Sequence, residues 1–373
     1  MARKQFLSFL LIFSLLISCA SALAEADDDD DWDDDVDDAW EMEHPLHSGD
    51  YAYALLDDGT VEITSYGGAD TEIVIPDTLD GKPVTAIGEL AFHFSLSLTS
   101  VTIPDSVTCI SKRAFSCCYN LMSIALPSGL TAIEPGTFEL CNSLTSIAIP
   151  DSITTIAEDA FVSCKALQSF TLSPNHPYFF LADGALCRTV DNTLLFYPNA
   201  RENRTYRIPD GIAAISAYAF YDCDLLESVV VPDSVTQLPA RAFSGCSALA
   251  SVSLPDSLTE IGTAAFSGCS ALTGIRIPAA ITEIINHTFS GCTSLATLEI
   301  PDSVTKIGDY AFFGCTSLTS IAIPDSVTAI GNGAFSNCTA LTLTVTPDSY
   351  AAEYAKANNI PYTYPDANDW LNN

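Results

Sequence analysis

A 23-residue unit decides the fold of this chain. Residues 300–322 read IPDSVTKIGDYAFFGCTSLTSIA, and the same order of apolar, polar and turn residues recurs along most of the sequence. A longer first copy begins at Pro76, and nine further copies begin at Pro104, Pro127, Pro150, Pro209, Pro232, Pro255, Pro278, Pro301 and Pro324. A repeat of this length is typical of a solenoid, in which each coil packs only on its neighbours. We therefore predict a stack of ten coils.

Apolar residues occupy fixed columns of the unit. Phe stands eleven residues after the proline and Leu seventeen after it, so both columns should face the interior of every coil. Within the unit, residues 317–324 alternate between inward and outward positions, which predicts a short strand that ends at Pro324. Residues 304–308 predict a second short strand, and residues 311–315 predict a short helical turn. Stacking should make both strands parallel to their copies in the next coil.

A column of cysteines lies fourteen residues after the proline. Its members are Cys118, Cys141, Cys164, Cys223, Cys246, Cys269, Cys292, Cys315 and Cys338. The column allows three interpretations: metal thiolates, disulfides between coils, or small buried thiols. Zinc sites use closely spaced Cys-x-x-Cys pairs, which the sequence lacks, and the column holds an odd number of cysteines. We therefore favour buried thiols, and Cys109, Cys117 and Cys187, outside the column, are the better candidates for a bridge.

The N-terminal residues carry the features of an export signal. Residues 1–24 are predicted to be a signal peptide, because Arg3 and Lys4 precede an apolar run that ends in small residues. Cleavage is expected after Ala24, and the alternative is a lipoprotein signal in which Cys19 carries the lipid anchor. Residues 25–47 are strongly acidic and are predicted to be a disordered linker. No later segment is predicted to span a membrane.

The remaining chain is expected to be a capped repeat array with one interruption. Its predicted segments are an N-terminal capping hairpin at 48–75, repeats 1–4 at 76–172, a hairpin insertion at 173–208, repeats 5–10 at 209–346, and a C-terminal cap of helix plus strand at 347–373. Both ends need caps, because a solenoid otherwise exposes unpaired strand edges.

The charge of the chain excludes some classes of partner. There are 47 acidic residues against 14 Lys and Arg, a formal charge of −33, which argues against nucleic acid and against an anionic membrane surface. The five His residues are scattered, and no phosphate-binding loop, nucleophile motif or zinc motif is present. The sequence therefore predicts no enzyme, no cofactor and no metal.

The repeats resemble a known family. The unit, the variant first copy around residues 80–84, the interrupting segment and the tail at 350–355 are similar to the BspA-like leucine-rich-repeat family. The resemblance implies a leucine-rich-repeat-like stack of ten 23-residue coils, with short parallel strands and short helical turns. It also implies an exported bacterial protein, extracellular or at the cell surface, that binds host matrix protein or glycan in adhesion. It supplies no catalytic residues.

The candidate binding residues lie where the columns are broken. Outward strand positions are mostly small and uncharged, so an extended protein or glycan can lie along them. Aromatic and Arg side chains, which are enriched at binding sites, gather in the insertion, and a second charged stretch interrupts the later strands. The candidates are Tyr178, Phe179, Phe180, Tyr197, Arg201, Arg204, Arg207, Arg276 and Glu299. The alternative is a structural solenoid that displays another segment and has no specific ligand.

Overall fold

The structure is a computed structural model that describes residues 45–365. The predicted signal peptide, the candidate lipid anchor at Cys19 and residues 25–44 of the predicted linker lie outside the described residues. The same holds for residues 366–373 of the predicted C-terminal cap.

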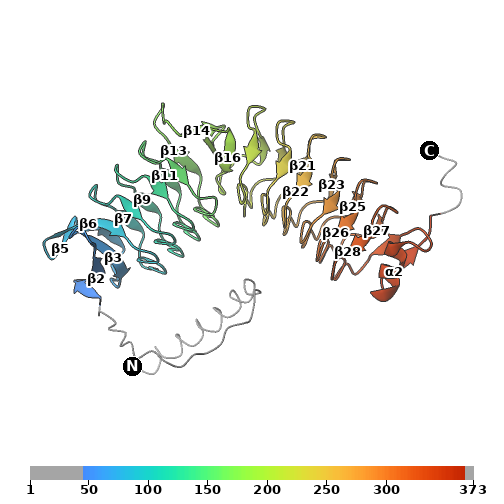
Figure 1. Cartoon of the computed structure of the whole chain (residues 1–373), viewed down its shortest axis with the longest axis horizontal. Coiled ribbons are helices and arrows are strands. Elements are labelled where there is room, and N and C mark those ends of the chain that lie inside the picture. Colours follow the sequence, from blue (N-terminus) through green and yellow to red (C-terminus); the bar gives the residue numbers. More distant parts are fainter. Residues whose placement is uncertain (1–44, 366–373) are drawn as a thin grey trace, which may run out of the picture. The chain divides into compact units, whose positions relative to one another are not determined.

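The described residues form successive coils that stack in one row, with a three-residue strand in nearly every coil (Figure 1). The strands of this first row are β4 (Glu72–Val74), β7 (Ser100–Thr102), β9 (Ser123–Ala125), β11 (Ser146–Ala148), β13 (Ser169–Thr171), β17 (Thr205–Arg207), β19 (Ser228–Val230), β21 (Ser251–Ser253), β23 (Gly274–Arg276), β25 (Thr297–Glu299), β27 (Ser320–Ala322), β29 (Thr342–Thr344) and the two-residue β30 (Tyr362–Thr363). Paired strands are parallel, and equivalent residues of neighbouring repeats face each other, as Ser228 faces Ser251. The predicted solenoid of short parallel strands is confirmed, and its first row continues into both caps.

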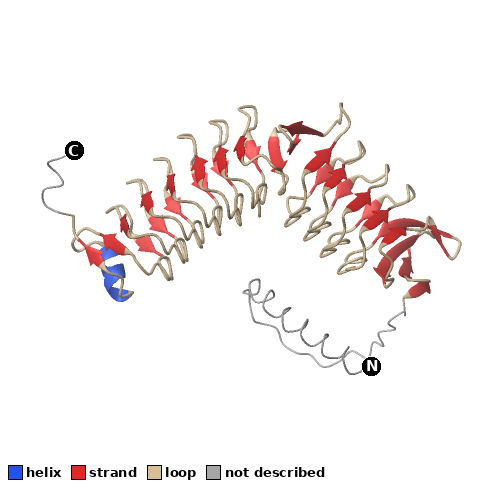
Figure 2. Ribbon diagram, turned by 180° about the vertical axis from the view of Figure 1, so that it is seen from behind, coloured by secondary structure: helices blue, strands red, loops and turns tan. Residues whose placement is uncertain are grey.

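A second row of strands, most of them two residues long, lies on another side of the coils (Figure 2). It begins with β3 (Val61–Tyr66) and β6 (Lys82–Ile87) and continues through β8 (Cys109–Ile110), β10 (Ala132–Ile133), β12 (Thr155–Ile156), β18 (Ala214–Ile215), β20 (Gln237–Leu238), β22 (Glu260–Ile261), β24 (Glu283–Ile284), β26 (Lys306–Ile307) and β28 (Ala329–Ile330). In each two-residue strand the second residue is buried, which anchors the strand to the core.

The segment around each Phe of the core forms consecutive turns, and in residues 45–365 the α-helix is confined to α2 (Tyr350–Ala357). In one repeat, Tyr310 and Gly314 have φ of 53° and 72°, on either side of Phe312. The N–H groups of these three residues donate to carbonyls of the next coil, at 2.8–3.0 Å. A continuous helix would direct the same N–H groups to its own carbonyls. Left-handed residues therefore replace the predicted helical turn with turns that link the coils.

Phenylalanine rings stack through the core from coil to coil. In each half of the array neighbouring ring centroids are 4.8–6.0 Å apart, and their planes lie within 17° of parallel. Every ring of this ladder is at most 4% exposed. The Phe and Leu columns therefore form the interior, as the sequence predicts.

The cysteine column supplies hydrogen bonds to the same core. Each column thiol donates to the carbonyl oxygen of the aromatic residue in the preceding coil, as Cys269 Sγ does to Phe243 O at 3.1 Å. None of the nine is in a disulfide, and all except Cys338 are buried. Burial raises the pKa of the Cys164 and Cys292 thiols to about 12. These properties agree with the buried-thiol interpretation.

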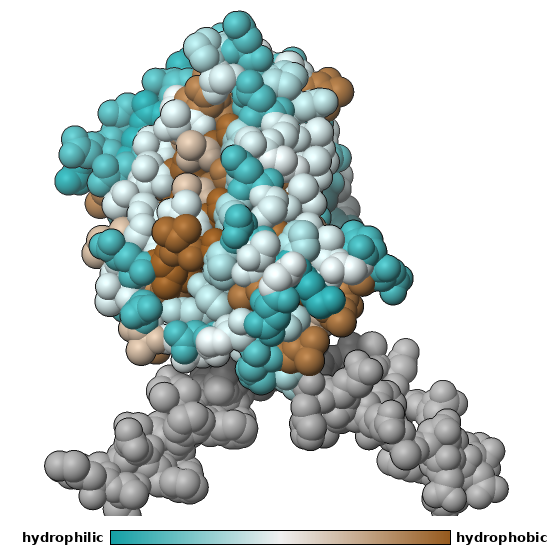
Figure 3. All heavy atoms as spheres, turned by 90° about the vertical axis from the view of Figure 1, so that its left-hand side faces the viewer, coloured by the Kyte–Doolittle hydropathy of each residue, from teal (hydrophilic) through white to brown (hydrophobic). Residues whose placement is uncertain are grey.

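Separate elements close the two ends of the described array. At the N-terminal end, β1 (Leu46–Ser48) and β2 (Tyr51–Leu55) pair antiparallel beside β3, and the short β5 (Thr78–Leu79) pairs with β6. The strand β1 therefore begins inside the predicted linker. Figure 3 shows this end, where hydrophobic patches stay visible among hydrophilic side chains. At the other end, Ser349 caps α2 by accepting from the Ala352 N–H, and Tyr354 packs edge-on against Phe335.

The insertion forms a small sheet that separates two hydrophobic cores, and we call this sheet the wall. It contains β14 (Phe179–Ala182), β15 (Ala185–Arg188) and β16 (Thr193–Phe196), which pair antiparallel in that order, while β16 also pairs parallel with β18. Leu186 and Leu195 pack on the N-terminal core, whereas Cys187 and Leu194 pack on the C-terminal core. The alternation of a strand thus gives each core one face of the same sheet. The predicted hairpins therefore lie mostly between the two halves, and β14 is their outermost strand.

Candidate binding surface

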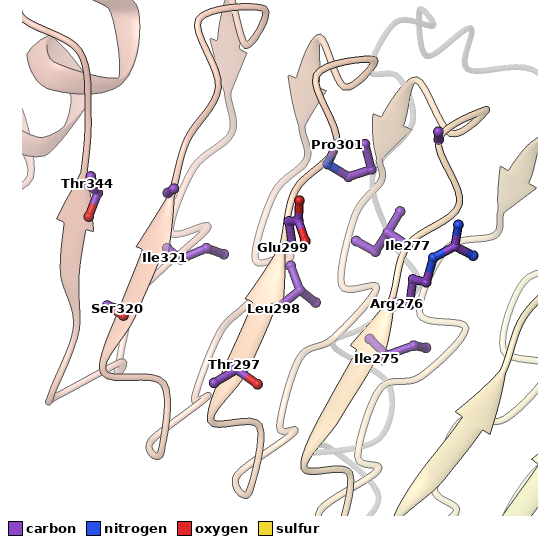
Figure 4. A pocket seen from close by; sticks show the side chains of 12 residues that line it. Ile275, Arg276, Ile277, Thr297, Leu298, Glu299, Pro301, Ser320, Ile321 and Thr344 are labelled. Atoms are coloured by element: carbon purple, nitrogen blue, oxygen red, sulfur yellow. The ribbon is translucent and has the colours of Figure 1, made fainter. Parts of the chain in front are cut away.

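The outward face of the first strand row is hollowed around β23, β25, β27 and β29 (Figure 4). The depression has a volume of about 860 Å³, and we call it the strand-face groove. It is lined by the outward residues Arg276, Thr297, Glu299, Ser320, Ala322 and Thr344, together with Ala279 and Pro301. Ile275, Leu298 and Ile321 lie beneath them, and their side chains are buried in the C-terminal core. Because the outward residues of β27 are small, the groove stays open along the strands.

Changes on both sides of one repeat proline, Pro278, lie at this groove. In the strand before Pro278, Gly274 stands where other copies have Ser or Thr, and Arg276 replaces a mostly small residue. After the proline, Ala279 replaces the Asp that follows it in most copies. The short Ala side chain lowers the rim, and Arg276 adds a cation to a mostly uncharged strand face. Three columns therefore depart from the consensus beside one another.

The charges in the groove come from two neighbouring strands. Arg276 lies directly opposite Glu299 in the register of β23 and β25. The Arg276 guanidinium donates to the Asp256 carboxylate of the preceding coil at 2.6 Å. Arg207, at the equivalent position of its own coil, pairs with Asp210 three residues later at 3.1 Å. The residue three positions after Arg276 is Ala279, which has no carboxylate, so Arg276 pairs with Asp256 of the preceding coil. Glu299 forms no ion pair with any residue in the described range 45–365.

A second depression continues the strand-face groove along the same row. It has a volume of about 520 Å³ and lies between Arg207 at one end and Arg276 at the other. Asp233 and Ser253 line it between the two ion pairs. The sequence candidates Arg207, Arg276 and Glu299 are therefore brought into one line along the strand face. The small outward residues between them belong to the strand face that the sequence indicates for an extended ligand, but the sequence does not predict a depression there. The loss of the Asp column at Ala279 is the signal that marks its position.

The other candidates occupy the insertion, and two of them are core residues. Phe179 and Tyr197 are only 2% and 3% exposed, and the Tyr197 ring stacks on Phe220, 5.3 Å between centroids, as a member of the aromatic ladder. Tyr197 stands 23 residues before Phe220, a spacing that already places it in the Phe column. These two side chains therefore support the array from inside. Tyr178 is exposed, and Phe180 is half-buried against the C-terminal core.

The arginines of the insertion are held by acidic partners. Arg201 is bound by the carbonyl and carboxylate of Asp183, and its guanidinium lies over the Tyr197 ring. Arg204 pairs with Glu227 of the next coil. These two candidates do not reach the strand-face groove. Their paired charges leave this region close to neutral.

A third depression lies beside β14. It has a volume of about 630 Å³ and is lined by uncharged residues of the insertion together with His176. The His176 ring is buried, its Nε2 atom contacts Pro150 O at 3.0 Å, and its Nδ1 atom accepts from the N–H groups of Tyr178 and Phe179. This histidine therefore fixes the start of β14 to the last coil before the insertion.

Among the residues that the structure describes, no group of three or more His, Cys, Asp and Glu side chains is placed to hold a metal ion. In the same part of the chain, no helix has the length and apolar character needed to cross a bilayer.

Comparison with known proteins agrees with this architecture. The family model described as BspA type Leucine rich repeat region (6 copies) matches residues 69–180 and 213–342. A leucine-rich repeat protein from Eubacterium ventriosum ATCC 27560 is 24% identical with a TM-score of 0.59, over 78% of this chain and 93% of that one. The pneumococcal vaccine antigen PcpA is 17% identical with a TM-score of 0.60, over 87% of this chain and 99% of that one. Both share the fold.

A leucine rich cell surface protein from Faecalibacterium prausnitzii A2-165 is 29% identical over 88% of this chain and 97% of that one, with a TM-score of 0.48. No curated protein matches the sequence. The family match covers more than half of the residues, in the same repeats that build the two strand rows. The chain therefore belongs to the BspA-type leucine-rich-repeat family.

Proposed function

We propose that this protein is exported and binds an extracellular macromolecule, a host matrix protein or a glycan, in adhesion or another contact at the cell surface. The observation that carries the proposal is the strand-face groove, where the repeat departs from its own consensus. A purely structural array has no need of that departure, because the consensus residues stack equally well. Membership of the BspA-type family is consistent with a binding role.

The dimensions of the surface favour an extended ligand. From β17 to β29 the two depressions cross seven strands of the first row, and six spacings of about 4.8 Å give a length of about 29 Å. Pockets for small molecules are enclosed, whereas this surface is open along its length. The hydroxyls of Thr297, Ser320 and Thr344 along this face match a polymer that makes many modest contacts. Arg276 and Glu299 would supply the polar contacts that fix its register.

An array of matrix proteins and glycans tests the proposal. We expect binding to at least one class of molecule, and the variants Arg276→Ala and Glu299→Ala should each weaken it by about tenfold or more, since a charged hydrogen bond contributes about 1.5–3 kcal/mol. Glu260→Ala is the matched control for Glu299→Ala, because Glu260 is also exposed but lies in the second strand row. Arg113→Ala, at the turn edge, is the control for Arg276→Ala.

Two results would contradict the binding site or the function. If ligands bind equally well to all four variants, the site is elsewhere. If no matrix protein or glycan binds, the structural alternative is preferred.

Export has its own test at the N-terminus. Mass spectrometry of the protein from its native cells should find a chain that starts at Glu25, as expected for cleavage after Ala24. A chain that starts at a lipid-modified Cys19 would support the lipoprotein alternative. An unprocessed N-terminus would contradict both.

A further inference from the structure

The edge of β14 presents backbone groups that no described strand pairs. The insertion sheet has the order β14-β15-β16-β18, so β14 is an outer strand. The Thr189 N–H donates to Tyr178 O, and Ala182 faces Ala185 across a two-residue turn. The alternation of an antiparallel pair then turns the N–H and C=O groups of Phe179 and Leu181 away from β15. The Phe179 N–H is taken by His176 Nδ1, which leaves Leu181 as the donor on this edge.

This edge lacks the usual protection against strand pairing. Exposed edge strands normally carry charges or proline, which discourage another strand from adding. The four residues of β14 are Phe-Phe-Leu-Ala, with no charge and no proline. Around them Leu181, Tyr178 and Val190 are 41%, 43% and 86% exposed. Exposed apolar side chains that lie near one another are a feature of interaction surfaces.

The surroundings of β14 determine which molecule fits. The third depression, about 630 Å³, lies beside the strand and can receive a side chain. The two arginines nearest the hairpin are neutralised, Arg188 by Asp191 at 2.7 Å and Arg201 by Asp183 at 3.2 Å. On a chain of net charge −33, this neutral rim matches an uncharged partner better than a charged one.

We propose that the β14 edge binds an extended, uncharged polypeptide segment of a partner protein. The segment adds as a strand, its backbone pairs with Leu181, and an apolar side chain enters the depression beside β14. A glycan does not offer amide groups at the two-residue period of a strand, so the partner here is a polypeptide. This site goes beyond the strand-face groove, from which it is separate, and it makes the insertion a second binding element.

The test uses an array of eight-residue peptides in which apolar residues alternate with Ser or Thr. The best binder is then made in two N-methylated forms, one with methyl groups on the odd amides and one with methyl groups on the even amides. Strand addition uses one edge of the peptide, so one form should bind at least about tenfold more weakly, and the other should bind as the parent does. Fluorescence anisotropy with the full chain measures the affinities.

Variants of the protein give the complementary result. Leu181→Pro removes the edge N–H at a position where proline is tolerated, whereas Leu181→Ala removes only the side chain. We expect about tenfold weaker peptide binding for Leu181→Pro and a smaller loss for Leu181→Ala. The variants Arg276→Ala and Glu299→Ala should bind the peptide normally, even if no matrix protein or glycan binds to the groove.

The proposal is overturned by any of four outcomes. These are no peptide that binds, equal effects of the two methylation patterns, equal affinities of the Leu181→Pro and Leu181→Ala variants, or a loss of peptide binding in the groove variants. A concentration-dependent dimer that the Leu181→Pro substitution abolishes would assign the edge to a second copy of this chain instead. The methylated peptides keep the test decisive if the Leu181→Pro protein fails to fold.

Discussion

Replacement of one ring in the aromatic ladder should destabilise half of the array. Phe266 is fully buried, and its ring lies between Phe243 and Phe289 at centroid distances of 5.5 and 5.7 Å. Replacing a buried Phe with Ala costs about 3–5 kcal/mol, and the two stacked pairs contribute about 0.5–1.5 kcal/mol each to that cost. The Phe266→Ala variant should therefore lose about this much of its free energy of unfolding.

The wall formed by β15 and β16 limits where that loss appears. The two cores are separate clusters, and Phe266 belongs to the C-terminal one. Hydrogen exchange followed by mass spectrometry reports the opening of each segment. In Phe266→Ala, amides of the coils between residues 205 and 345 should exchange faster by about two to three and a half powers of ten, while those between 53 and 170 should be unchanged.

The matched control is Phe313→Ala. Phe313 is one of the outward aromatic residues, in edge contact with Tyr310 at 5.9 Å, and its loss should cost less than about 1 kcal/mol. Equal exchange rates in the two variants would refute the assignment of the Phe column to the core. Faster exchange in both halves of the Phe266→Ala variant would refute the separation of the two cores.

Three further results are expected. In the native protein a thiol reagent at neutral pH should label Cys109 first, because Cys109 is exposed, and the buried cysteines of the column should react only after unfolding. Rapid labelling of Cys269 in the native protein would contradict the burial of this column. The free energy of unfolding should fall as pH rises from about 8.5 towards 12, because the unfolded chain loses thiol protons that the folded chain keeps. The decrease should reach up to about 1.4 kcal/mol per pH unit for each buried thiol. Urea titrations at pH 8 and pH 10 with equal midpoints would contradict this. The Gly268→Ala substitution should lower the free energy of unfolding, measured by heat or urea, by about 1–2 kcal/mol, because Gly268 has φ of 75°. The control Gly211→Ala should be neutral or slightly stabilising, because no atom lies within 4 Å of the added Cβ atom. Equal costs of the two substitutions would contradict the left-handed turn.

The sequence was sufficient to predict the repeating part of the fold. A strict 23-residue spacing places equivalent residues against each other, so the Phe and Leu columns must pack on their own copies. The resemblance to the BspA-like family is confirmed by the family match. The predicted helical turn was the exception. Apolar spacing alone does not reveal that residues such as Tyr310 adopt left-handed φ and direct their N–H groups to the next coil.

The candidate site was predictable only where it breaks the repeat. Arg276 and Glu299 depart from their columns, and both line the strand-face groove. Residue type alone predicts Tyr197 and Phe179 as binding residues, yet both are buried, because the insertion rejoins the array. The signal was present in the spacing of 23 between Tyr197 and Phe220. The unpaired edge of β14 depends on the order of strands in the insertion sheet, which composition does not specify.

The wall across the core also bears on how the chain finds its register. Every ordinary coil offers its neighbours the same Phe, Leu and Cys contacts, so a coil that skipped its neighbour and closed on the next one along would meet a matching surface. Errors of this kind cost little in contact energy and are hard to reverse once further coils have added. Residues 179–196 match no other part of the chain, because each face of their sheet fits a different core. Because this segment can pack in one place alone, it fixes the register of the coils on both sides.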